Sequence, residues 1–440
     1  MWLLRHLSAL SGAAVRLYYR ATRDGGTVPD SGPVLVVGNH PNSLLDPAFL
    51  AWVARRPVRF LAKAPLFTDR LVGWLVRASG SIPVYRRQDD PGQMGRNDET
   101  FRAVHDVLAG GAAVALFPEG ISHSEPSLAP LKTGAARIAL GAARRVGHAF
   151  PIVPVGLVFR AKDQFRSEAH AVVGDPVEWD DLAMRGDHDH EAVRVLTERI
   201  AHAMRSVTLN LARWEDEAVV RTAEAVWAGA HGLEESAAGR TARLGTTADV
   251  LARIRASGDE HWNALAVDVS DFARTLAMLR MQPEDVTVDT GLSSAARWTM
   301  RRLTLLGLVQ FALAAVAIVV FWIPYRLTGF VAGRMTHDKD TVSTYRVLGG
   351  ALIFVVWIAA LATVAGVIGG WGFAIAAALA LPIVAVAGLY AAEHWRWTLV
   401  TARRWLLVRR GGAAIIALRN RQAELARRLD AALVAHFPDS

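Results

Sequence analysis

Short β-branched runs alternate with helical segments along residues 33–176 of this 440-residue chain. Runs with the length and composition of buried strands are "PVLVVG", "VRFLAK", "SIPVYR", "AVALFPEG", "PIVPVGLVF" and "AVVGDP". The segments "ETFRAVHDVLAGG" and "GAARIALGAARR" lie between them and have helical spacing. This alternation predicts an α/β domain with a largely buried sheet flanked by helices, which we place at residues 29–215.

Amphipathic helices are expected at both ends of this domain. The first, "MWLLRHLSALSGAAVRLYYRAT", falls within residues 1–28, and its apolar side chains recur at helical spacing at Leu3, Leu7, Leu10, Ala14 and Leu17. Arg5 and His6 interrupt this apolar run too early for a signal peptide or a membrane span, so the helix either lies in a membrane interface or packs on the domain. The second helix falls within residues 190–215, and its apolar face consists of Val193, Leu196, Ile200, Met204, Val207 and Leu211.

The tetrapeptide "DHDH", Asp187–His190, precedes the second helix and has two interpretations. It could supply metal ligands, or it could be a solvated loop that caps the helix at Glu191. Because adjacent side chains of a loop rarely converge on one ion, we expect capping and no metal site.

Apolar residues are concentrated in the last third of the chain. An accessory helical segment, residues 216–300, carries no chemical motif and is followed by three apolar stretches, Leu303–Ile323, Val347–Ile368 and Trp371–Ala391. A bilayer core needs roughly 20 apolar residues per helix, so each stretch is long enough to cross. We therefore expect membrane helices over residues 301–395 and a basic helical tail over residues 396–440.

Positive residues flank each apolar stretch, and only the turn at Gly369–Gly372 lacks them. The positive-inside rule then puts this turn outside and predicts an inner (cytoplasmic) membrane protein whose α/β domain lies on the cytoplasmic side. Three full spans would carry the basic tail to the far side. We therefore expect Leu303–Ile323, ending at Pro324, to be re-entrant or interfacial.

Composition narrows the possible chemistry. The chain has no cysteine, which excludes disulfides, thiolate nucleophiles and cysteine-ligated zinc or iron–sulfur sites. It has 49 Lys plus Arg against 41 Asp plus Glu, and a basic surface suits anionic lipid headgroups, phosphates or acidic carrier proteins. Nucleic acid is possible on charge alone, but no zinc-finger spacing, P-loop or aromatic–basic RNA motif is present, so we expect no nucleic-acid partner.

The segment "NHPNSLLD", Asn39–Asp46, follows the first strand of the domain. A hydroxyl that attacks a thioester must lose its proton, and a neutral imidazole is the natural base for this at pH 7. A carboxylate on the other ring nitrogen fixes the tautomer and stabilises the imidazolium. His40 and Asp46 meet these needs if the turn between them folds back into a helix; the alternative is a turn rich in Asn, Pro and Ser with no catalytic role.

Two further motifs supply groups that suit a phosphate. In "GSIPVYRR", Arg86 presents a fork of donors beyond a strand, whereas Arg87 would point the other way. In "LFPEGISHSEPSLAPLKTGAARIAL", a strand delivers Glu119 and Gly120 into a polar loop, and Lys132 leads into a helix whose N-terminus favours an anion. Glu119 could hold a hydroxyl or pair with Arg86. The alternatives are a surface arginine at a strand end and a structural ion pair at Glu119.

The motifs N-H-x5-D, G-x-I-x-V-x-R, F-P-E-G and P-I-V-P-V occur in this order between about residues 30 and 215. This arrangement resembles the glycerolipid acyltransferase superfamily, which includes glycerol-3-phosphate and lysophosphatidate acyltransferases. The resemblance implies an α/β fold with a mixed sheet flanked by helices, followed by a helical segment and a membrane-embedded helical region. It also implies that His40 is the base and Asp46 its orienter, with Arg86, Glu119, Gly120 and Lys132 around the phosphorylated acceptor.

Two features depart from most members of that superfamily. Five residues separate His40 from Asp46 where four are usual, and Ile121, Ser122 and His123 follow F-P-E-G where bacterial lysophosphatidate enzymes often have an arginine. Both features, with "PSLAPLKTG" behind them, resemble the fungal-type acyltransferases that use glycerol 3-phosphate or dihydroxyacetone phosphate.

The resemblance implies a membrane-bound enzyme that moves a fatty acyl group from acyl-CoA or acyl carrier protein to a hydroxyl of glycerol 3-phosphate or 1-acylglycerol 3-phosphate. Its expected partners are membrane lipids, the acyl donor and the glycerol-phosphate acceptor, with no cofactor and no metal. A lysophospholipid reacylation enzyme, a thioester hydrolase and a non-catalytic lipid-binding membrane protein remain as alternatives.

Overall fold

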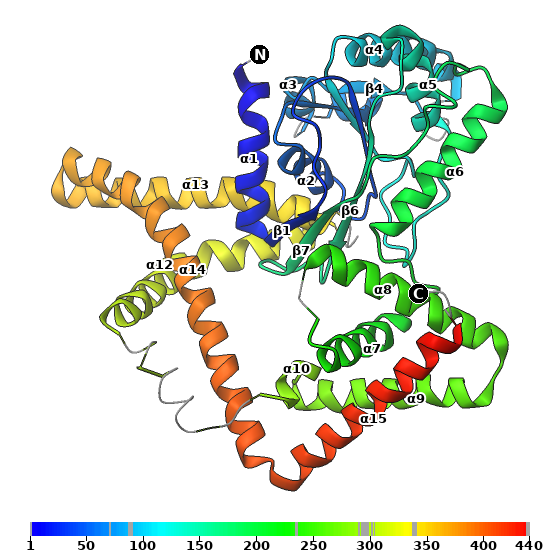
Figure 1. Ribbon diagram of the computed structural model, residues 1–440. Coiled ribbons are helices and arrows are strands. Elements are labelled where there is room, and N and C mark those ends of the chain that lie inside the picture. The colour runs from blue at the N-terminus through cyan, green and yellow to red at the C-terminus, as the bar shows by residue number, and fades with distance from the viewer. Residues whose placement is uncertain are drawn as a thin grey trace. The chain divides into compact units, whose positions relative to one another are not determined.

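The computed structural model describes residues 2–69, 72–86, 91–233, 236–288, 291, 299–300, 302, 304–336 and 341–436 (Figure 1). Arg87 and Leu303, which the sequence analysis names, lie outside these residues. The chain forms two compact units. The first comprises Met1–Trp214, Glu235–Thr246 and Asp338–Thr344, and the second comprises Glu215–Glu234, Thr247–His337 and Tyr345–Ser440.

The first unit is built on a seven-stranded sheet with the strand order β1-β7-β6-β2-β5-β3-β4. Its pairings are parallel except for β6 with β7, which is antiparallel. The strands are β1 (Arg20–Gly25), β2 (Val34–Gly38), β3 (Val58–Lys63), β4 (Ile82–Val84), β5 (Ala113–Leu116), β6 (Ile152–Phe159) and β7 (Glu168–Val173). The predicted α/β fold with a mixed sheet is confirmed.

The central strands β2 and β5 are buried along their whole length, which explains their β-branched composition. They run parallel, and Val37 is the register partner of Leu116. Because parallel strands in register end at the same edge of the sheet, the loops that follow β2 and β5 leave from neighbouring positions. These loops carry the two main sequence motifs.

Helices cover both faces of the sheet (Figure 1). Apolar side chains of α4, α5 and α6 form one core with β2 and β5, in which Leu108, Ile138 and Leu196 are buried. Helices α1 and α2 pack against each other. The elements are α1 (Trp2–Tyr18), α2 (Leu45–Ala54), η1 (Ala64–Phe67), α3 (Gly73–Ala78), η2 (Pro91–Arg96), α4 (Asn97–Ala109), α5 (Gly134–Val146) and α6 (His190–Ser206).

The N-terminal helix is shorter than its sequence predicts. It ends at Tyr18, and the next residues form β1, which pairs with β7 as an edge strand. The guanidinium of Arg166 donates to the carbonyls of Arg16, Leu17 and Tyr19 and so takes up acceptors at the helix end. The expectation of helix through Thr22 is wrong because pairing with a distant strand outweighs the local periodicity.

Helix α1 packs on the domain through a face other than its predicted leucine stripe. Val15 is buried, and Gly12 lies so close to Trp52 that a Cβ there would be 2.5 Å from Cδ1 of that ring. Leu10 and Leu17 of the stripe are 56% and 42% exposed. The helix therefore contacts the domain and also presents apolar side chains to its surroundings.

Helix α6 begins as the sequence predicts. The Asp189 side chain accepts hydrogen bonds from the backbone N–H groups of Glu191 and Ala192, both at 3.0 Å, and so caps the helix. The side chain of His188 is 92% exposed. No three His, Asp or Glu side chains cluster as a potential metal site within the described part of the chain.

The second unit is helical, as expected for the region after residue 215. Its elements are α7 (Asp216–Ala230), α8 (Ala237–Ser257, from Thr247), α9 (Glu260–Leu279), α10 (Pro283–Val286), α12 (Leu305–Met335), α13 (Val342–Gly369, from Tyr345), α14 (Trp371–Arg410) and α15 (Gly412–His436). Helices α7, α9, α10 and α15 share a core that contains Val226, Phe272, Val286 and Leu425. Trp227 donates to Asp430 at 2.7 Å and ties α7 to α15.

Helices α12, α13 and α14 are long and apolar enough to cross a membrane. They contain the three predicted apolar stretches, and Gly370 separates the last two. Most of their large apolar side chains are exposed, and such an apolar surface is typical of helices that contact lipid. These helices give the chain its membrane-associated character.

The expectation that the first apolar segment ends at Pro324 is wrong. Helix α12 continues through this proline to Met335, and its 31 residues span about 46 Å. Proline lacks an N–H and therefore leaves the Val320 carbonyl, four residues earlier, without its helical donor. The indole N–H of Trp357 on α13 donates to that carbonyl at 3.1 Å, so the helix passes the proline with this acceptor satisfied.

Candidate active site

The loop after β2 is anchored at its first residue. The side chain of Asn39 donates to the Leu157 carbonyl of β6 at 3.0 Å and accepts from the Leu157 N–H at 2.7 Å. Ser43 then adopts φ +49°, and this left-handed residue reverses the chain. Helix α2 starts at Leu45, so Asp46 lies in its first turn. The turn thus folds back into a helix, which is the condition that pairing of His40 with Asp46 requires.

His40 and Asp46 are hydrogen-bonded through Nδ1 and Oδ2, which are 2.8 Å apart. The same carboxylate oxygen accepts the backbone N–H of Asn42 at 2.7 Å. The Asp46 side chain is fully buried, whereas the His40 side chain is 20% exposed. Since the carboxylate occupies Nδ1, the Nε2 atom of His40 is the ring nitrogen left for a substrate, and it receives no hydrogen bond from the described residues.

Two features of its surroundings act on this pair. The His40 ring stacks on Phe117, with ring centroids 4.1 Å apart and planes at 10°, which limits ring rotation. Burial raises the pKa of Asp46, while the hydrogen bond from His40 and the Asn42 N–H favour its ionised form. The carboxylate is therefore a buried group whose charge depends on the imidazole beside it.

Glu119 is buried and binds three groups of the protein. Its Oε1 accepts the backbone N–H of His40 at 2.9 Å, and its Oε2 accepts the Ala129 N–H at 2.8 Å. Oε2 is also hydrogen-bonded to Nε2 of His123. The side chain is 1% exposed. Glu119 thus joins the His40 loop to two points of the loop after β5.

Both ring nitrogens of His123 are engaged. Nδ1 accepts the backbone N–H of Glu125 at 3.1 Å, so the proton lies on Nε2, which donates to Glu119. The backbone N–H of His123 donates to the His40 carbonyl at 3.2 Å. His123 is therefore a fixed neutral donor rather than a second free base, and sequence reasoning had given it no role.

Gly120 brings the phosphate-suited residues together. It adopts φ +75°, a left-handed conformation that favours glycine. Its carbonyl accepts from Nη1 of Arg86 at 2.9 Å, and a Cβ on this glycine would lie 3.4 Å from Cγ of Lys132. Lys132 forms no ion pair with the described residues and is exposed just before α5. Glu119 thus contacts His40, while its neighbour Gly120 accepts from Arg86 and lies beside the methylene stem of Lys132.

A cleft opens at this point of the first unit. Its lining includes His40, Glu119 and His123 from the two motif loops, together with Asn39, Pro41, Glu125, Ser127, Leu128, Thr208 and Leu209. The His40 side chain therefore faces a space that a small polar molecule could enter.

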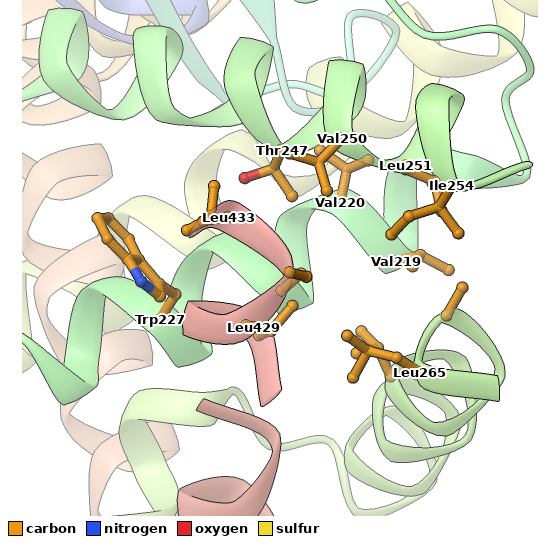
Figure 2. A pocket seen from close by; sticks show the side chains of 14 residues that line it. Val219, Val220, Trp227, Thr247, Val250, Leu251, Ile254, Leu265, Leu429 and Leu433 are labelled. Atoms are coloured by element: carbon orange, nitrogen blue, oxygen red, sulfur yellow. The ribbon is translucent and has the colours of Figure 1, made fainter. Parts of the chain in front are cut away.

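A separate cavity in the second unit lies among α7, α8, α9 and α15 (Figure 2). Its lining is apolar apart from the Thr247 hydroxyl and the indole N–H of Trp227. None of the described residues that line it carries an imidazole or carboxylate that could move a proton. The cleft at His40 is therefore the candidate active site.

Sequence reasoning missed Asn39, His123 and Lys162. The Nζ atom of Lys162 lies 2.5 Å from the Pro41 carbonyl and 2.7 Å from Oγ of Ser124. Lys162 belongs to no motif, and its contact with Pro41 spans 121 positions. A single sequence holds no signal for such a contact.

Comparison with known proteins finds a family model that matches part of the first unit. Residues 22–158 match the family model described as Acyltransferase. The chain is 37% identical over 134 residues to glycerol-3-phosphate O-acyltransferase 2 of Saccharomyces cerevisiae, a match that covers 30% of this chain and 18% of the yeast protein. It is 30% identical over 129 residues to a 1-acyl-sn-glycerol-3-phosphate acyltransferase of Chlamydomonas reinhardtii, covering 29% of this chain and 37% of the algal protein.

The chain thus spans less than a fifth of the length of the yeast relative. The crystal structure of the 1-acyl-sn-glycerophosphate acyltransferase from Thermotoga maritima gives a TM-score of 0.34 at 20% identity, over 47% of this chain and 78% of that one. The similarity to the acyltransferase family thus extends over residues 22–158 of this chain.

Proposed function

We propose that this chain transfers a fatty acyl group from acyl-CoA or acyl carrier protein to a hydroxyl of glycerol 3-phosphate or 1-acylglycerol 3-phosphate. The observation that carries the proposal is the 2.8 Å hydrogen bond between His40 and the buried Asp46 at the cleft of an acyltransferase-family domain. The yeast relative is named for glycerol 3-phosphate, which makes that compound the first acceptor to test.

In this mechanism Nε2 of His40 takes the proton of the acceptor hydroxyl as its oxygen attacks the thioester carbonyl. Asp46 holds the proton on Nδ1 and stabilises the imidazolium. The tetrahedral intermediate then collapses: the new C–O ester bond remains, the C–S bond breaks, and the imidazolium returns its proton to the thiolate that leaves. The protein ends the cycle unchanged, so no further reactant is needed.

The phosphate of the acceptor would bind beside Gly120. Arg86 supplies a guanidinium that already holds the Gly120 carbonyl, and Lys132 supplies an exposed ammonium before the N-terminus of α5. For Glu119 we propose a holding role, since its carboxylate already binds three groups of the protein. This role differs from the expected contact with the acceptor.

The decisive assay uses membranes that contain the full chain, labelled acyl-CoA, and either glycerol 3-phosphate or 1-acylglycerol 3-phosphate. We expect acceptor-dependent ester formation that falls by about three to six powers of ten in His40→Ala. His188→Ala is the matched control, because this histidine is exposed. Position-specific analysis of the product identifies the acylated hydroxyl.

The same assay separates the alternatives. A thioester hydrolase would release free fatty acid without an acceptor, and a reacylation enzyme would prefer lysophospholipids with a full headgroup in an acceptor panel. Equal activity of the native chain and His40→Ala would overturn the mechanism.

We also propose that the first unit lies on the cytoplasmic side of the membrane. Arginines flank the apolar helices, whereas the turn at Gly370 has none. A side-specific reporter placed in this turn should label from outside, and one at the N-terminus, in the first unit, should label from the cytoplasmic side. Both results together would mean that α12 does not cross.

A further inference from the structure

Lys162, in the loop after β6, connects the two loops of the site. Its ammonium lies 2.5 Å from the Pro41 carbonyl, 2.7 Å from Oγ of Ser124 and 3.4 Å from the His123 carbonyl. An ammonium carries three donors and no acceptor, so it can donate to each of these oxygens. Pro41 follows His40 directly, and Ser124 follows His123. One side chain therefore fixes both loops that line the cleft.

The backbone of Lys162 is itself held by buried groups. Its carbonyl accepts hydrogen bonds from the hydroxyls of Tyr19 and Ser343, both fully buried side chains of the same compact unit. The Tyr19 hydroxyl in turn accepts from Nδ2 of Asn42 at 2.6 Å. The His40 loop is thus tied to Lys162 twice, directly at Pro41 and through Asn42 and Tyr19.

The positive charge of Lys162 also affects the hydrogen-bonded pair of His40 and Asp46. Burial raises the pKa of Asp46, and after the contacts with His40 and Asn42 the positive charge of Lys162 lowers it. A neutral side chain at position 162 would lose both this field and the three donors.

We propose that Lys162 is a positioning residue for acyl transfer, whose ammonium joins the His40 loop to the loop of Glu119 and His123 and so fixes the imidazole in the cleft. This inference rests on the proposed function and adds a residue to it. The hydrogen bonds of its ammonium to Pro41, His123 and Ser124 place Lys162 against the loops of the site, so it acts on the rate of the chemical step through the placement of His40.

The absence of cysteine makes a clean test available. In Lys162→Cys the introduced thiol is the sole one in the chain, and 2-bromoethylamine converts it to S-aminoethylcysteine, which restores an ammonium at nearly the length of lysine. Gln164→Cys, treated identically, is the matched control because Gln164 is an exposed residue of the same loop. The full chain in membranes or detergent is used throughout.

Two readouts are measured for each variant: kcat and KM with glycerol 3-phosphate, and hydrogen–deuterium exchange of the peptides that contain residues 39–46 and 119–129. In Lys162→Cys we expect kcat to fall about tenfold to a hundredfold, with KM changed by less than about threefold. Both peptides should exchange faster. Aminoethylation should restore kcat and slow exchange, while Gln164→Cys should match the native chain before and after treatment.

The inference is overturned if Lys162→Cys retains native kcat, or if complete aminoethylation restores neither kcat nor exchange. An increase in KM alone would also overturn it, because that result places Lys162 on the acceptor. Should the native chain acylate neither acceptor, the proposed function fails; unchanged exchange in Lys162→Cys would then still refute the positioning role.

Discussion

The backbone N–H of His40 donates a hydrogen bond to Oε1 of Glu119, and the two atoms are 2.9 Å apart. This bond joins the second residue after β2 to the glutamate of F-P-E-G in the loop after β5. His40 is therefore held at its backbone by the carboxylate of Glu119 and at its ring by the carboxylate of Asp46. This double attachment leads to the first two predictions.

Replacing Glu119 with glutamine should reduce both stability and rate. Whichever way the amide is oriented, its NH2 group faces an N–H donor, either that of His40 or that of Ala129. An unsatisfied buried donor costs about 1–3 kcal/mol, so the free energy of unfolding should fall by that amount. Denaturant unfolding of the detergent-solubilised chain measures it. Glu125→Gln, an exposed isosteric change in the same loop, should leave stability unchanged.

Replacing Asp46 with asparagine should separate activity from stability. The amide can present its NH2 group to Nδ1 of His40 and favour the tautomer whose Nε2 is protonated, so kcat should fall by about four powers of ten. Burial raises the pKa of Asp46, which means that its ionised form is disfavoured in the folded chain. A neutral amide removes this cost, but an NH2 group in the place of Oδ2 faces the Asn42 N–H, which costs about 1–3 kcal/mol, so the unfolding temperature at pH 7 should change little.

Kinetics and thermal unfolding of Asp46→Asn, run side by side with the native chain, check both parts. Loss of activity together with a fall in the free energy of unfolding well beyond about 3 kcal/mol would contradict the view that the charge of Asp46 serves the chemistry and not the stability.

Buried His105 should make the first unit sensitive to acid. Burial, and then the charge of Arg145, lower the pKa of this imidazole below 6.5, while Asp187 and Asp106 oppose the shift. Its Nε2 is buried without a hydrogen-bond partner among the described residues. The unfolded chain therefore binds the proton first, and stability is lost as pH falls below 6.5 toward the lower pKa of the folded chain.

The slope from this single proton is about 1.4 kcal/mol per pH unit within that interval. The slope is measured from the unfolding midpoints of the native chain and of His105→Gln between pH 5 and 8. The stability of the variant should depend less steeply on pH than that of the native chain. His188→Gln, at an exposed position, should follow the native curve. Identical curves for native chain and His105→Gln would refute the prediction.

The contact between Trp357 and the Val320 carbonyl should stabilise the apolar helices only because position 324 is proline. Trp357→Phe removes the indole donor and should cost about 1 kcal/mol. In a Pro324→Ala background, the new N–H can satisfy Val320, so the same substitution should cost much less. A double-mutant cycle on unfolding in detergent measures the coupling, and a coupling energy of zero would argue against the contact.

The sequence by itself determined the helices and strands whose buried side chains recur at a regular spacing along the chain. The β-branched runs of β2, β5 and β6 lie where their patterns predict. Helix α6 begins where expected but ends at Ser206, which leaves Val207 and Leu211 of the predicted face outside it, and α12–α14 extend beyond the ends of the predicted apolar stretches. The motif spacing also identified His40 and Asp46 as a pair, since six positions with a turn-forming segment between them bring the two side chains together locally.

Only the tertiary structure decided which distant groups meet. In the tertiary structure β1 pairs with β7, and Glu119 accepts a hydrogen bond from His40, 79 positions away. Lys162 contacts both loops of the site. Periodicity reports how often a side chain faces the core, and it carries no information on which remote segment supplies a partner. Those contacts depend on strand order and register, which arise when the whole sheet assembles.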